Sequence, residues 1–253
     1  MQTLVILPTY KEAENITAIL RAIRSSVIDI HVLVVDDASP DGTAELAEKL
    51  SLELGGIYLL KRRAKSGLGS AYREGFAWGL EQGYEALIEM DADFSHDPGA
   101  LGSLINAVEQ GADLVIGSRY VQGGSIPNWT LHRRLLSQWG NIYAAYCLGL
   151  PIRDLTSGFR VFRASLLQNL DLDKIQAEGY GFQIEMAYKS QQIGAKIVEV
   201  PISFTDRVKG ESKMSMKTVI EALFLVGIWG ILRVTGIERL LYGNKAKKLK
   251  SYF

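Results

Sequence analysis

The sequence predicts an α/β protein in which helices cover both faces of a mostly parallel sheet. Short aliphatic runs alternate with segments whose apolar residues recur at helical spacing, from the N-terminus to about residue 120. Several of these runs stop at carboxylates, glycine or proline, as buried parallel strands do at their carboxyl ends. With 253 residues, 47% of them hydrophobic, the chain can form one large domain with a short appendage.

The first half of the chain contains the expected strands and helices in alternation. The strands are Leu4–Leu7, Val32–Val35, Ile57–Leu60, Ala86–Met90 and Leu114–Ile116. The helices contain residues 16–23, about 44–54, the stretch from the basic link 61–69 to about Gln82, and Leu101–Val108. Right-handed crossovers place the carboxyl ends of parallel strands on one edge of the sheet, where ligands bind.

The second half is less regular. We expect a glycine-rich loop at Val121–Trp129, a helix at Leu131–Leu148, a polar turn at Arg153–Arg160 that leads into a strand, a helix containing Gly179–Met186, a last strand at Lys196–Phe204 and a charged loop at Thr205–Lys213. Glu185 lies among apolar residues of the second of these helices. It is either a surface position or, if buried, a group that holds the neighbouring loop.

Two carboxylates, Asp91 and Asp93, follow the fourth strand at the expected ligand edge. Oxygen ligands of this kind suit Mg²⁺ or Mn²⁺, and such a cation can bridge a diphosphate. The alternative is a solvated turn, since Asp-x-Asp is a weak motif on its own. Asp97 and Pro98 then indicate the start of the next helix.

Arg133 lies near the expected N-terminus of the helix Leu131–Leu148. The helix dipole disfavours a cation at this end, which indicates that the guanidinium faces an anion. An ordinary solvated helix end is the alternative.

Composition and missing motifs argue against several classes of function. The 28 acidic and 28 basic residues cancel, so no global field recruits nucleic acid. No Gly-x-Gly-x-x-Gly follows the first strand and no Gly-Lys-Ser/Thr loop occurs, which disfavours dinucleotide oxidoreductases and P-loop enzymes. A single cysteine, Cys147, and an N-terminus without signal-peptide features predict a cytoplasmic protein.

An apolar segment near the C-terminus departs from this pattern. Ala222–Leu232 holds eleven uncharged residues, which cover roughly half a bilayer core, so we do not expect it to span a membrane. The 18 residues after Thr235 carry five Lys and Arg against one Glu. We therefore predict a catalytic unit at 1–215 and an interfacial helical unit with a basic tail at 216–253. The alternative is a helix packed on the domain or on a small transmembrane partner subunit.

Seven motifs occur in order along the chain: PTYKEAENI, VVDDASPDGT, the strand end at Asp91 and Asp93, GSRY, DLTSGFRVF, GFQIEM and VPISFTDRVKGESKMS. From about residue 3 to residue 217 the chain thereby resembles the dolichol- or polyprenol-phosphate mannosyltransferases, inverting family 2 glycosyltransferases with the GT-A fold. The better match is the subfamily without long C-terminal membrane hairpins. The resemblance implies that GDP-mannose and a dolichyl or polyprenyl monophosphate give β-mannosyl phosphoryl polyprenol and GDP, on the cytosolic face of a membrane.

The resemblance also implies residue roles. The implied contacts of the nucleotide sugar are Pro8, Tyr10, Glu12, Asp37, Asp91, Arg207 and Lys213. Those of the acceptor phosphate are Arg119, Arg133 and Ser137, and those of Mg²⁺ or Mn²⁺ are Asp91 and Asp93. Ser95 stands where relatives often have Gln as a further metal ligand, which leaves the rest of the shell open. A phosphate monoester is already an anionic nucleophile, so Asp91, Asp93, Arg119 and Arg133 are expected to act by alignment and charge neutralisation, without a catalytic base.

Two other functions stay open. A polyprenyl-phosphate glucosyltransferase that uses UDP-glucose would share the Asp pair and the acceptor arginines. A non-catalytic protein that docks on a membrane partner through its C-terminal helix would not need them, so their presence argues against this hypothesis.

Overall fold

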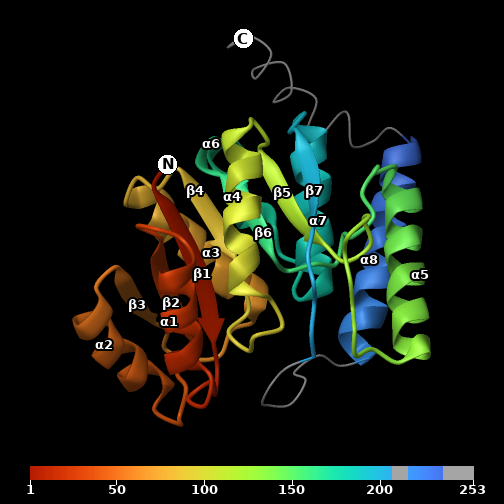
Figure 1. The fold of residues 1–253 in the computed structure, drawn as a ribbon. Coiled ribbons are helices and arrows are strands. Elements are labelled where there is room, and N and C mark those ends of the chain that lie inside the picture. Colours follow the sequence, from red (N-terminus) through yellow and green to blue (C-terminus); the bar gives the residue numbers. More distant parts are fainter. Residues whose placement is uncertain (207–215, 236–253) are drawn as a thin grey trace.

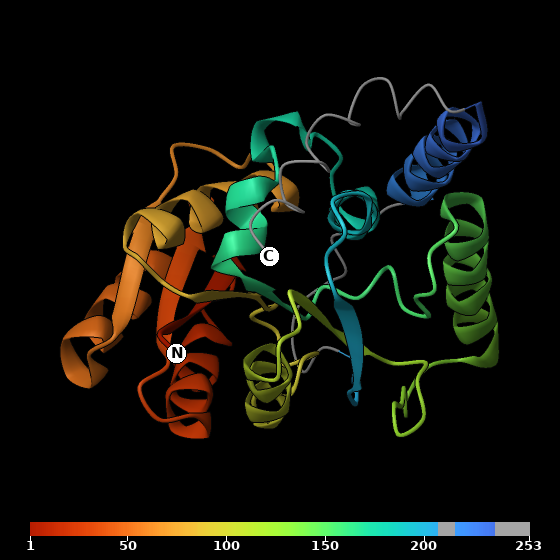
Figure 2. The same ribbon diagram turned by 90° about the horizontal axis from the view of Figure 1, so that it is seen from above.

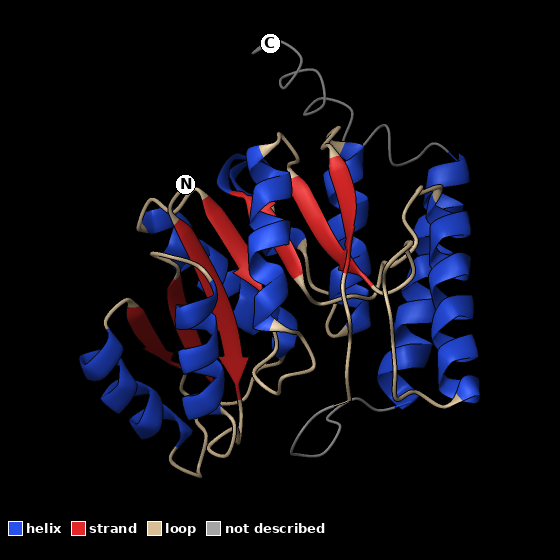
Figure 3. Ribbon diagram, in the orientation of Figure 1, coloured by secondary structure: helices blue, strands red, loops and turns tan. Residues whose placement is uncertain are grey.

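The computed structural model describes residues 1–206 and 216–235. Within these ranges, a seven-stranded sheet lies between layers of helices (Figure 1). The view from above in Figure 2 shows helices on both sides of the sheet, and Figure 3 separates the two kinds of element by colour. The expected α/β class with a mostly parallel sheet is confirmed.

One strand of the sheet runs against the others. The strands are β1 (Thr3–Thr9), β2 (His31–Asp36), β3 (Ile57–Lys61), β4 (Ala86–Glu89), β5 (Leu114–Ser118), β6 (Arg160–Arg163) and β7 (Ile197–Pro201), in the spatial order β3-β2-β1-β4-β6-β5-β7. Among these described strands, only β6 pairs antiparallel, with β4 on one side and β5 on the other. The carboxyl ends of the remaining strands share one edge, and β6 brings its amino end there. The last strand was predicted to end at Phe204, but it ends at Pro201.

The helices alternate with the strands as expected. They are α1 (Ile16–Ser26), α2 (Thr43–Leu54), α3 (Leu68–Glu81), α4 (Leu101–Glu109), α5 (Leu131–Leu148), α6 (Ala164–Asn169), α7 (Tyr180–Gln192) and α8 (Met216–Thr235). Asp97 caps a single 3₁₀ turn, Pro98–Ala100, that leads into α4, and its carboxylate accepts the N–H of Gly99 at 2.8 Å. The predicted helix start at Asp97 and Pro98 is confirmed.

Alternate side chains of each buried strand feed two separate cores, because successive residues of a strand point to opposite faces. In β1, Leu4 and Ile6 pack with residues of α3, α6 and α7. Val5 and Leu7 pack on the other face with residues of α1, α2 and α4. Burial on both faces explains why the strand is a continuous aliphatic run.

α5 and α8 lie side by side at the end of the molecule beyond β7 (Figures 1 and 2). Ala222 and Val226 of α8 are buried. Gly230 lets the two helices approach closely, since a Cβ there would be 3.2 Å from the Cβ of Cys147 in α5. α8 therefore packs on the domain.

The length of α8 corrects the sequence-based argument about this segment. The helix has 20 residues and not eleven, which at about 1.5 Å per residue gives roughly the thickness of a bilayer core. Thr218–Thr235 is the one stretch in the described part of the chain that is long and apolar enough to cross a membrane. The helix is therefore long enough to span a membrane, contrary to the expectation from Ala222–Leu232 alone.

Candidate active site

The carboxyl ends of β1, β2, β4 and β5 carry most of the residues predicted to bind substrate. Tyr10 and Glu12 follow β1, Asp37 follows β2, Asp91 follows β4 and Arg119 follows β5. These four strands run in the same direction, so the loops after them meet at one edge. The common edge inferred from the sequence is confirmed.

Three loops at this edge contain a non-glycine residue with left-handed backbone. The φ angles are 57° at Lys11 after β1, 54° at Ala38 after β2 and 63° at Phe94 after β4. Such conformations cost roughly 1–3 kcal/mol each and cluster at binding and catalytic sites. Phe94 directly follows Asp93, so the left-handed residue of this loop lies next to the carboxylate pair.

Backbone contacts fix the loop that carries Asp91 and Asp93. Asp93 is buried, and its Oδ1 accepts the N–H of Ser95 at 3.0 Å. Asp91 is half-buried, and its N–H donates to Nδ1 of His96 at 3.1 Å. Asp93 is thus held inside the loop, and Asp91 is the more exposed of the two residues.

His96 is a positioning residue that the sequence did not point to. Its ring stacks on Phe159, with centroids 4.9 Å apart, and meets the edge of Phe204 at 5.5 Å. Burial lowers the pKa of His96 to about 4. The ring is therefore neutral near pH 7, so Nδ1 can accept the N–H of Asp91.

Asp37, a predicted donor contact, forms a buried ion pair. The Arg62 guanidinium donates to its Oδ1 at 2.5 Å and also reaches Glu74 at 3.2 Å. The charge of Asp37 is therefore offset within the protein, and any nucleotide contact would use it as a hydrogen-bond acceptor. The preceding Asp36 accepts the Thr9 hydroxyl at 2.9 Å and is part of the fold.

Three further predicted donor contacts lie in β1 or in the loop that follows it. Pro8 is half-buried in β1, and Tyr10 follows it with its ring half-exposed. The Lys65 ammonium lies 4.3 Å from the centre of that ring. Glu12 accepts a hydrogen bond from the Asn15 side chain at 2.9 Å. An aromatic face and a cation beside a carboxylate can receive the base and phosphates of a nucleotide.

Arg119, predicted to bind the acceptor phosphate, is held by Asp154. Its Nε and Nη2 donate to the two carboxylate oxygens at 2.7 and 2.6 Å, and its backbone N–H donates at 2.9 Å. The side chains of Arg119 and Asp154 are 4% and 0% exposed. Burial acts to lower the pKa of Arg119, but the Asp154 carboxylate more than offsets it and the pKa is raised. Arg119 is thus a charged but neutralised group.

Trp129 joins the two arginines that were predicted to bind the acceptor. The guanidinium carbon of Arg133 lies 4.0 Å from the centre of its ring, and that of Arg119 lies 5.6 Å away. The indole N–H of Trp129 is buried and has no hydrogen-bond partner among the described residues. Arg133 donates to Asp206 at 2.6 Å, with side chains 52% and 43% exposed. Arg133 therefore has an anionic partner in Asp206, and both side chains are about half exposed to solvent.

Ser137, the third predicted acceptor contact, is tied to this cluster through polar side chains. Its hydroxyl accepts that of Tyr120 at 2.7 Å. The Asn141 amide donates to the Ser137 carbonyl at 2.9 Å and to the Thr156 hydroxyl at 3.1 Å. Arg119 donates to that same hydroxyl at 2.7 Å. The structure therefore brings Arg119, Arg133 and Ser137 together.

The loop between Asp154 and β6 is fixed by Arg160. The buried guanidinium donates to the carbonyls of Leu155, Ser157 and Gln183 at 2.6 to 2.8 Å. Glu89, opposite Arg160 in the β4–β6 ladder, is also buried, and burial raises its pKa to about 8. These groups lie within the sheet below the candidate site.

Glu185 is buried in α7 and holds a loop, one of the two alternatives expected for it. Its Oε2 accepts the N–H of Ala177 at 3.2 Å, and Lys189 pairs with it at 2.7 Å. The carboxylate thus fixes the segment before α7.

A cavity of about 130 Å³ lies between α5, α7 and α8. Trp129, Arg133 and Ser137 line one part of it. The rest is mainly apolar, with Leu136, Tyr143, Ala144, Ile184, Val219, Ala222, Leu223 and Val226. A phosphate with an attached hydrocarbon chain matches this combination of one guanidinium group and apolar walls.

Arg207 and Lys213, the remaining predicted donor contacts, lie outside the described residues. Four residues that position the site were not singled out from the sequence: Arg62, His96, Trp129 and Asp154. Two of them carried a signal, because Asp154 begins the DLTSGFRVF motif and Arg62 lies in the basic link 61–69. The others act through partners distant in the chain or through ring packing, which motif spacing does not reveal.

Comparison with known proteins identifies several relatives. A family model described as Glycosyl transferase family 2 matches residues 4–171. The chain is 47% identical over 231 residues to the polyprenol monophosphomannose synthase of Mycolicibacterium smegmatis, covering 91% of this chain and 87% of the relative. It is 48% identical over 231 residues to the undecaprenyl-phosphate mannosyltransferase of Micrococcus luteus, with 91% and 95% covered. The dolichol-phosphate mannosyltransferase of Pyrococcus furiosus is 36% identical over 248 residues, with 95% and 67% covered.

Solved structures extend the comparison to the fold. The glucosyl-3-phosphoglycerate synthase of Mycobacterium tuberculosis, in complex with Mn²⁺, UDP-glucose and phosphoglyceric acid, superposes with a TM-score of 0.66. The two chains are 18% identical, and the match covers 93% of this chain and 80% of that one. At this identity the likeness concerns the fold alone.

Proposed function

Because the chain belongs to glycosyl transferase family 2 and has the GT-A fold, we propose that its strand-end site transfers mannose from GDP-mannose to a polyprenyl monophosphate. The names of the relatives support mannose as the sugar and a polyprenyl phosphate as the acceptor. One observation carries the proposal: the loop of Asp91 and Asp93 shares the sheet edge with Arg119, and Arg119 contacts the same Trp129 ring as Arg133, which lines an apolar cavity.

The carboxylates of Asp91 and Asp93 fit a divalent cation that is shared with a diphosphate. No group of three or more His, Cys, Asp or Glu converges in the described part of the chain. Phosphate oxygens and water would complete the shell, as is usual for Mg²⁺. The buried Ser95 hydroxyl, without a partner among the described residues, is a further candidate ligand. Bound there, Mg²⁺ or Mn²⁺ would supply positive charge to the leaving diphosphate.

In the proposed reaction, an oxygen of the acceptor phosphate forms a bond to C1 of mannose on the face opposite the diphosphate. The bond from C1 to the diphosphate oxygen breaks, its electron pair leaves with GDP, and the configuration at C1 inverts. Arg133 and the Trp129 N–H would hold the attacking phosphate, with Arg119 close behind them. No proton has to be removed from the nucleophile, so orientation and charge compensation suffice.

The sheet topology supports this arrangement of donor and acceptor. β6 lies between β4, which ends near the Asp pair, and β5, which ends before Arg119. Neighbouring strands are about 4.8 Å apart, so the two strand ends are separated by roughly 10 Å. A gap of this size accommodates one sugar ring between a diphosphate on one side and a phosphate on the other.

The choice of donor is the first test of the proposal. Purified enzyme is offered GDP-mannose, UDP-glucose or UDP-GlcNAc with a polyprenyl phosphate, and the lipid product is analysed. We expect transfer from GDP-mannose only. Transfer from UDP-glucose would favour the glucosyltransferase alternative, and no transfer from any donor would favour the non-catalytic one.

Arg133→Ala is expected to impair use of the lipid phosphate far more than binding of the nucleotide sugar. The guanidinium is half-exposed at the mouth of the cavity and pairs with Asp206. Loss of a charge-assisted contact to phosphate should raise KM for polyprenyl phosphate by about tenfold or more. Steady-state kinetics and calorimetry with GDP-mannose measure the two effects.

Arg134→Ala is the matched control, because Arg134 is an exposed neighbour on the same helix that does not line the cavity. It should behave like the parent. A collapse of GDP-mannose affinity in Arg133→Ala, with KM for the acceptor unchanged, would move Arg133 to the donor site.

Two helices support the proposal that the enzyme is peripheral on the cytosolic face of a membrane. Both α5 and α8 expose a stripe of large apolar side chains spaced by three or four residues. These are Leu131, Leu135, Trp139, Ile142 and Tyr146 in α5, and Ile220, Phe224, Ile228, Ile231 and Val234 in α8. The stripes lie on neighbouring helices that also enclose the apolar cavity. A membrane in contact with the stripes would therefore lie next to the cavity in which we place the hydrocarbon chain of the acceptor. The basic residues expected to assist, in the tail 236–253, lie outside the described residues.

Replacing Trp139 and Phe224 by Asp is expected to abolish flotation with liposomes and to reduce transfer to long polyprenyl phosphates. A cut at residue 217 is a poorer test, since removing α8 would uncover the core around Val226. Leu52→Asp is the control, because Leu52 is 87% exposed on α2, away from this surface. Unchanged flotation of the Trp139/Phe224 variant would show that the apolar stripes do not contact lipid.

A further inference from the structure

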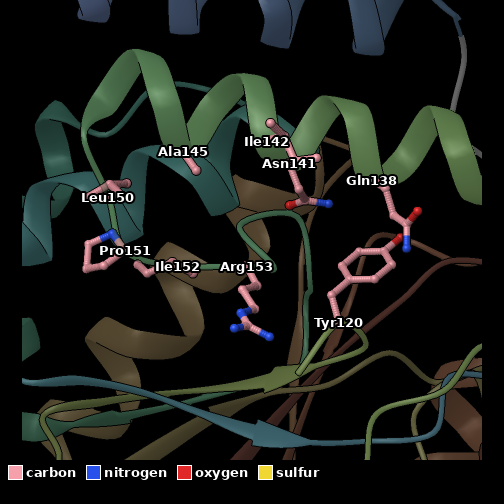
Figure 4. A pocket seen from close by; sticks show the side chains of 9 residues that line it. All are labelled: Tyr120, Gln138, Asn141, Ile142, Ala145, Leu150, Pro151, Ile152 and Arg153. Atoms are coloured by element: carbon pink, nitrogen blue, oxygen red, sulfur yellow. The ribbon is translucent and has the colours of Figure 1, made fainter. Parts of the chain in front are cut away.

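A second, larger pocket lies on the other side of α5 from the acceptor cavity. It has a volume of about 600 Å³ and no lining residue in common with that cavity. Its walls are formed by α5, by the segment 150–153 that follows α5, and by Tyr120 (Figure 4). Volumes of this order are typical of sites for small organic ligands. This pocket is separate from the proposed donor site and from the cavity proposed for the acceptor.

Arg153 gives the pocket an exposed guanidinium group. Its guanidinium forms no hydrogen bond or ion pair with any residue that the structure describes. The nearby carboxylate of Glu199 accepts the backbone N–H groups of Arg153 and Asp154 at 2.9 Å each and forms no ion pair with the Arg153 guanidinium. Gln138 and the Tyr120 ring line the same pocket, as Figure 4 shows. An anion with oxygen acceptors fits this end of it.

The other side of the pocket is mainly apolar and extends to the molecular surface at Ile142. Ile142, Ala145, Leu150 and Ile152 line it. Ile142 is 67% exposed and also belongs to the outward apolar stripe of α5. A ligand whose anionic group reaches Arg153 could therefore extend a hydrocarbon chain over Ile142 towards the proposed membrane surface. Free phosphate would satisfy only the polar end.

The pocket also adjoins residues that contact Arg119 and Ser137, two of the proposed acceptor-phosphate residues. Tyr120, in its wall, donates to the Ser137 hydroxyl at 2.7 Å. Arg153 immediately precedes Asp154, which holds the Arg119 guanidinium. A ligand in the pocket would thus contact Tyr120, which holds Ser137, and Arg153, which is adjacent in sequence to the residue that holds Arg119.

We propose that this pocket binds an anionic membrane phospholipid, with its phosphate on Arg153 and an acyl chain over Ile142, and that the bound lipid promotes use of the polyprenyl phosphate. The proposal rests on the proposed function in so far as the acceptor is a membrane lipid. It adds a site for a lipid that is not a substrate, which couples acceptor use to the composition of the membrane.

The direct test uses a photoactivatable phosphatidylglycerol in phosphatidylcholine vesicles with the full chain. We expect crosslinks to peptides from α5 and residues 150–153, reduced about tenfold in Arg153→Gln, the loss expected for one charge-assisted contact. Arg134→Gln removes the same charge from exposed surface of α5 and should crosslink like the parent. Equal yields in the parent and Arg153→Gln would overturn the proposal.

Two competitors identify the source of the anion. Excess inorganic phosphate should leave the crosslink intact, because it lacks the apolar part. Polyprenyl phosphate should also leave it intact, and loss of the crosslink would assign the pocket to the acceptor instead. Displacement by inorganic phosphate would show an anion site without lipid selectivity and would likewise overturn the proposal.

The functional arm measures mannose transfer as phosphatidylglycerol replaces phosphatidylcholine. The parent and Arg134→Gln should be stimulated, whereas Arg153→Gln should keep the rate found without phosphatidylglycerol and lose the stimulation. Stimulation of all three proteins alike would contradict the proposed coupling. If no mannose is transferred but crosslinking depends on Arg153, the proposed function fails and the lipid site stands.

Discussion

Alanine at Asp91 or at Asp93 is expected to lower mannose transfer by about 10²- to 10⁴-fold. The leaving group is a diphosphate, whose charge must be offset as the bond to C1 breaks, and a bound cation contributes several kcal/mol to this. Asp91 is the more exposed of the two carboxylates, whereas Asp93 is buried and also accepts the N–H of Ser95. Excess EDTA should inactivate the parent, and added Mg²⁺ or Mn²⁺ should restore it.

Asp97→Ala is the matched control for the carboxylate pair. Asp97 lies in the same loop, but its side chain caps the turn at Pro98–Ala100. Its loss should cost about 1 kcal/mol of stability, as a helix cap does, and leave turnover close to that of the parent. For Asp93, the variant Asp93→Asn keeps the contact with the Ser95 N–H and separates charge from loop structure. Full activity of the parent in excess chelator would refute a metal-dependent mechanism.

The features that sequence predicted best are those set by local pattern. Continuous aliphatic runs such as Leu4–Leu7 and Val32–Val35 correspond to strands buried on both faces. A crossover helix between two strands of one sheet usually makes the strands parallel. The order of strands and helices was therefore enough to place Asp37 and Asp91 at one edge of the sheet. It was not enough to predict the antiparallel β6, because the insertion of this strand between β4 and β5 depends on a long return of the chain.

Pairings between distant residues were beyond local pattern. Asp37 was expected to meet a nucleotide and is paired with Arg62, and Arg119 was expected to meet a phosphate and is paired with Asp154. Charge at a strand end indicates that some partner is needed, but it does not distinguish a ligand from another side chain. For α8, counting only the uncharged residues between Glu221 and Arg233 underestimated the helix, which extends beyond both of these charges. The contacts of these residues with substrate stay predictions.

Asp154→Ala is expected to destabilise the protein by about 3–5 kcal/mol, because it leaves the buried Arg119 guanidinium without its counter-ion. The carboxylate accepts three hydrogen bonds from Arg119, at 2.6 to 2.9 Å, and both side chains are shielded from water. Denaturant unfolding measures the effect as a lower midpoint at constant slope. Asp206→Ala removes the exposed partner of Arg133 and should cost at most about 1 kcal/mol.

A double variant separates the charge from the space that the pair fills. Arg119→Met combined with Asp154→Ala buries no unpaired charge, so it should recover much of the stability lost in Asp154→Ala alone. It should not recover acceptor use, since the proposed phosphate cluster then lacks one of its guanidinium groups. If Asp154→Ala cost no more than Asp206→Ala, Arg119 would have to reach water or another anion. If the double variant used polyprenyl phosphate as well as the parent does, Arg119 would act only in the fold, and the acceptor phosphate would depend on Arg133 and the Trp129 N–H.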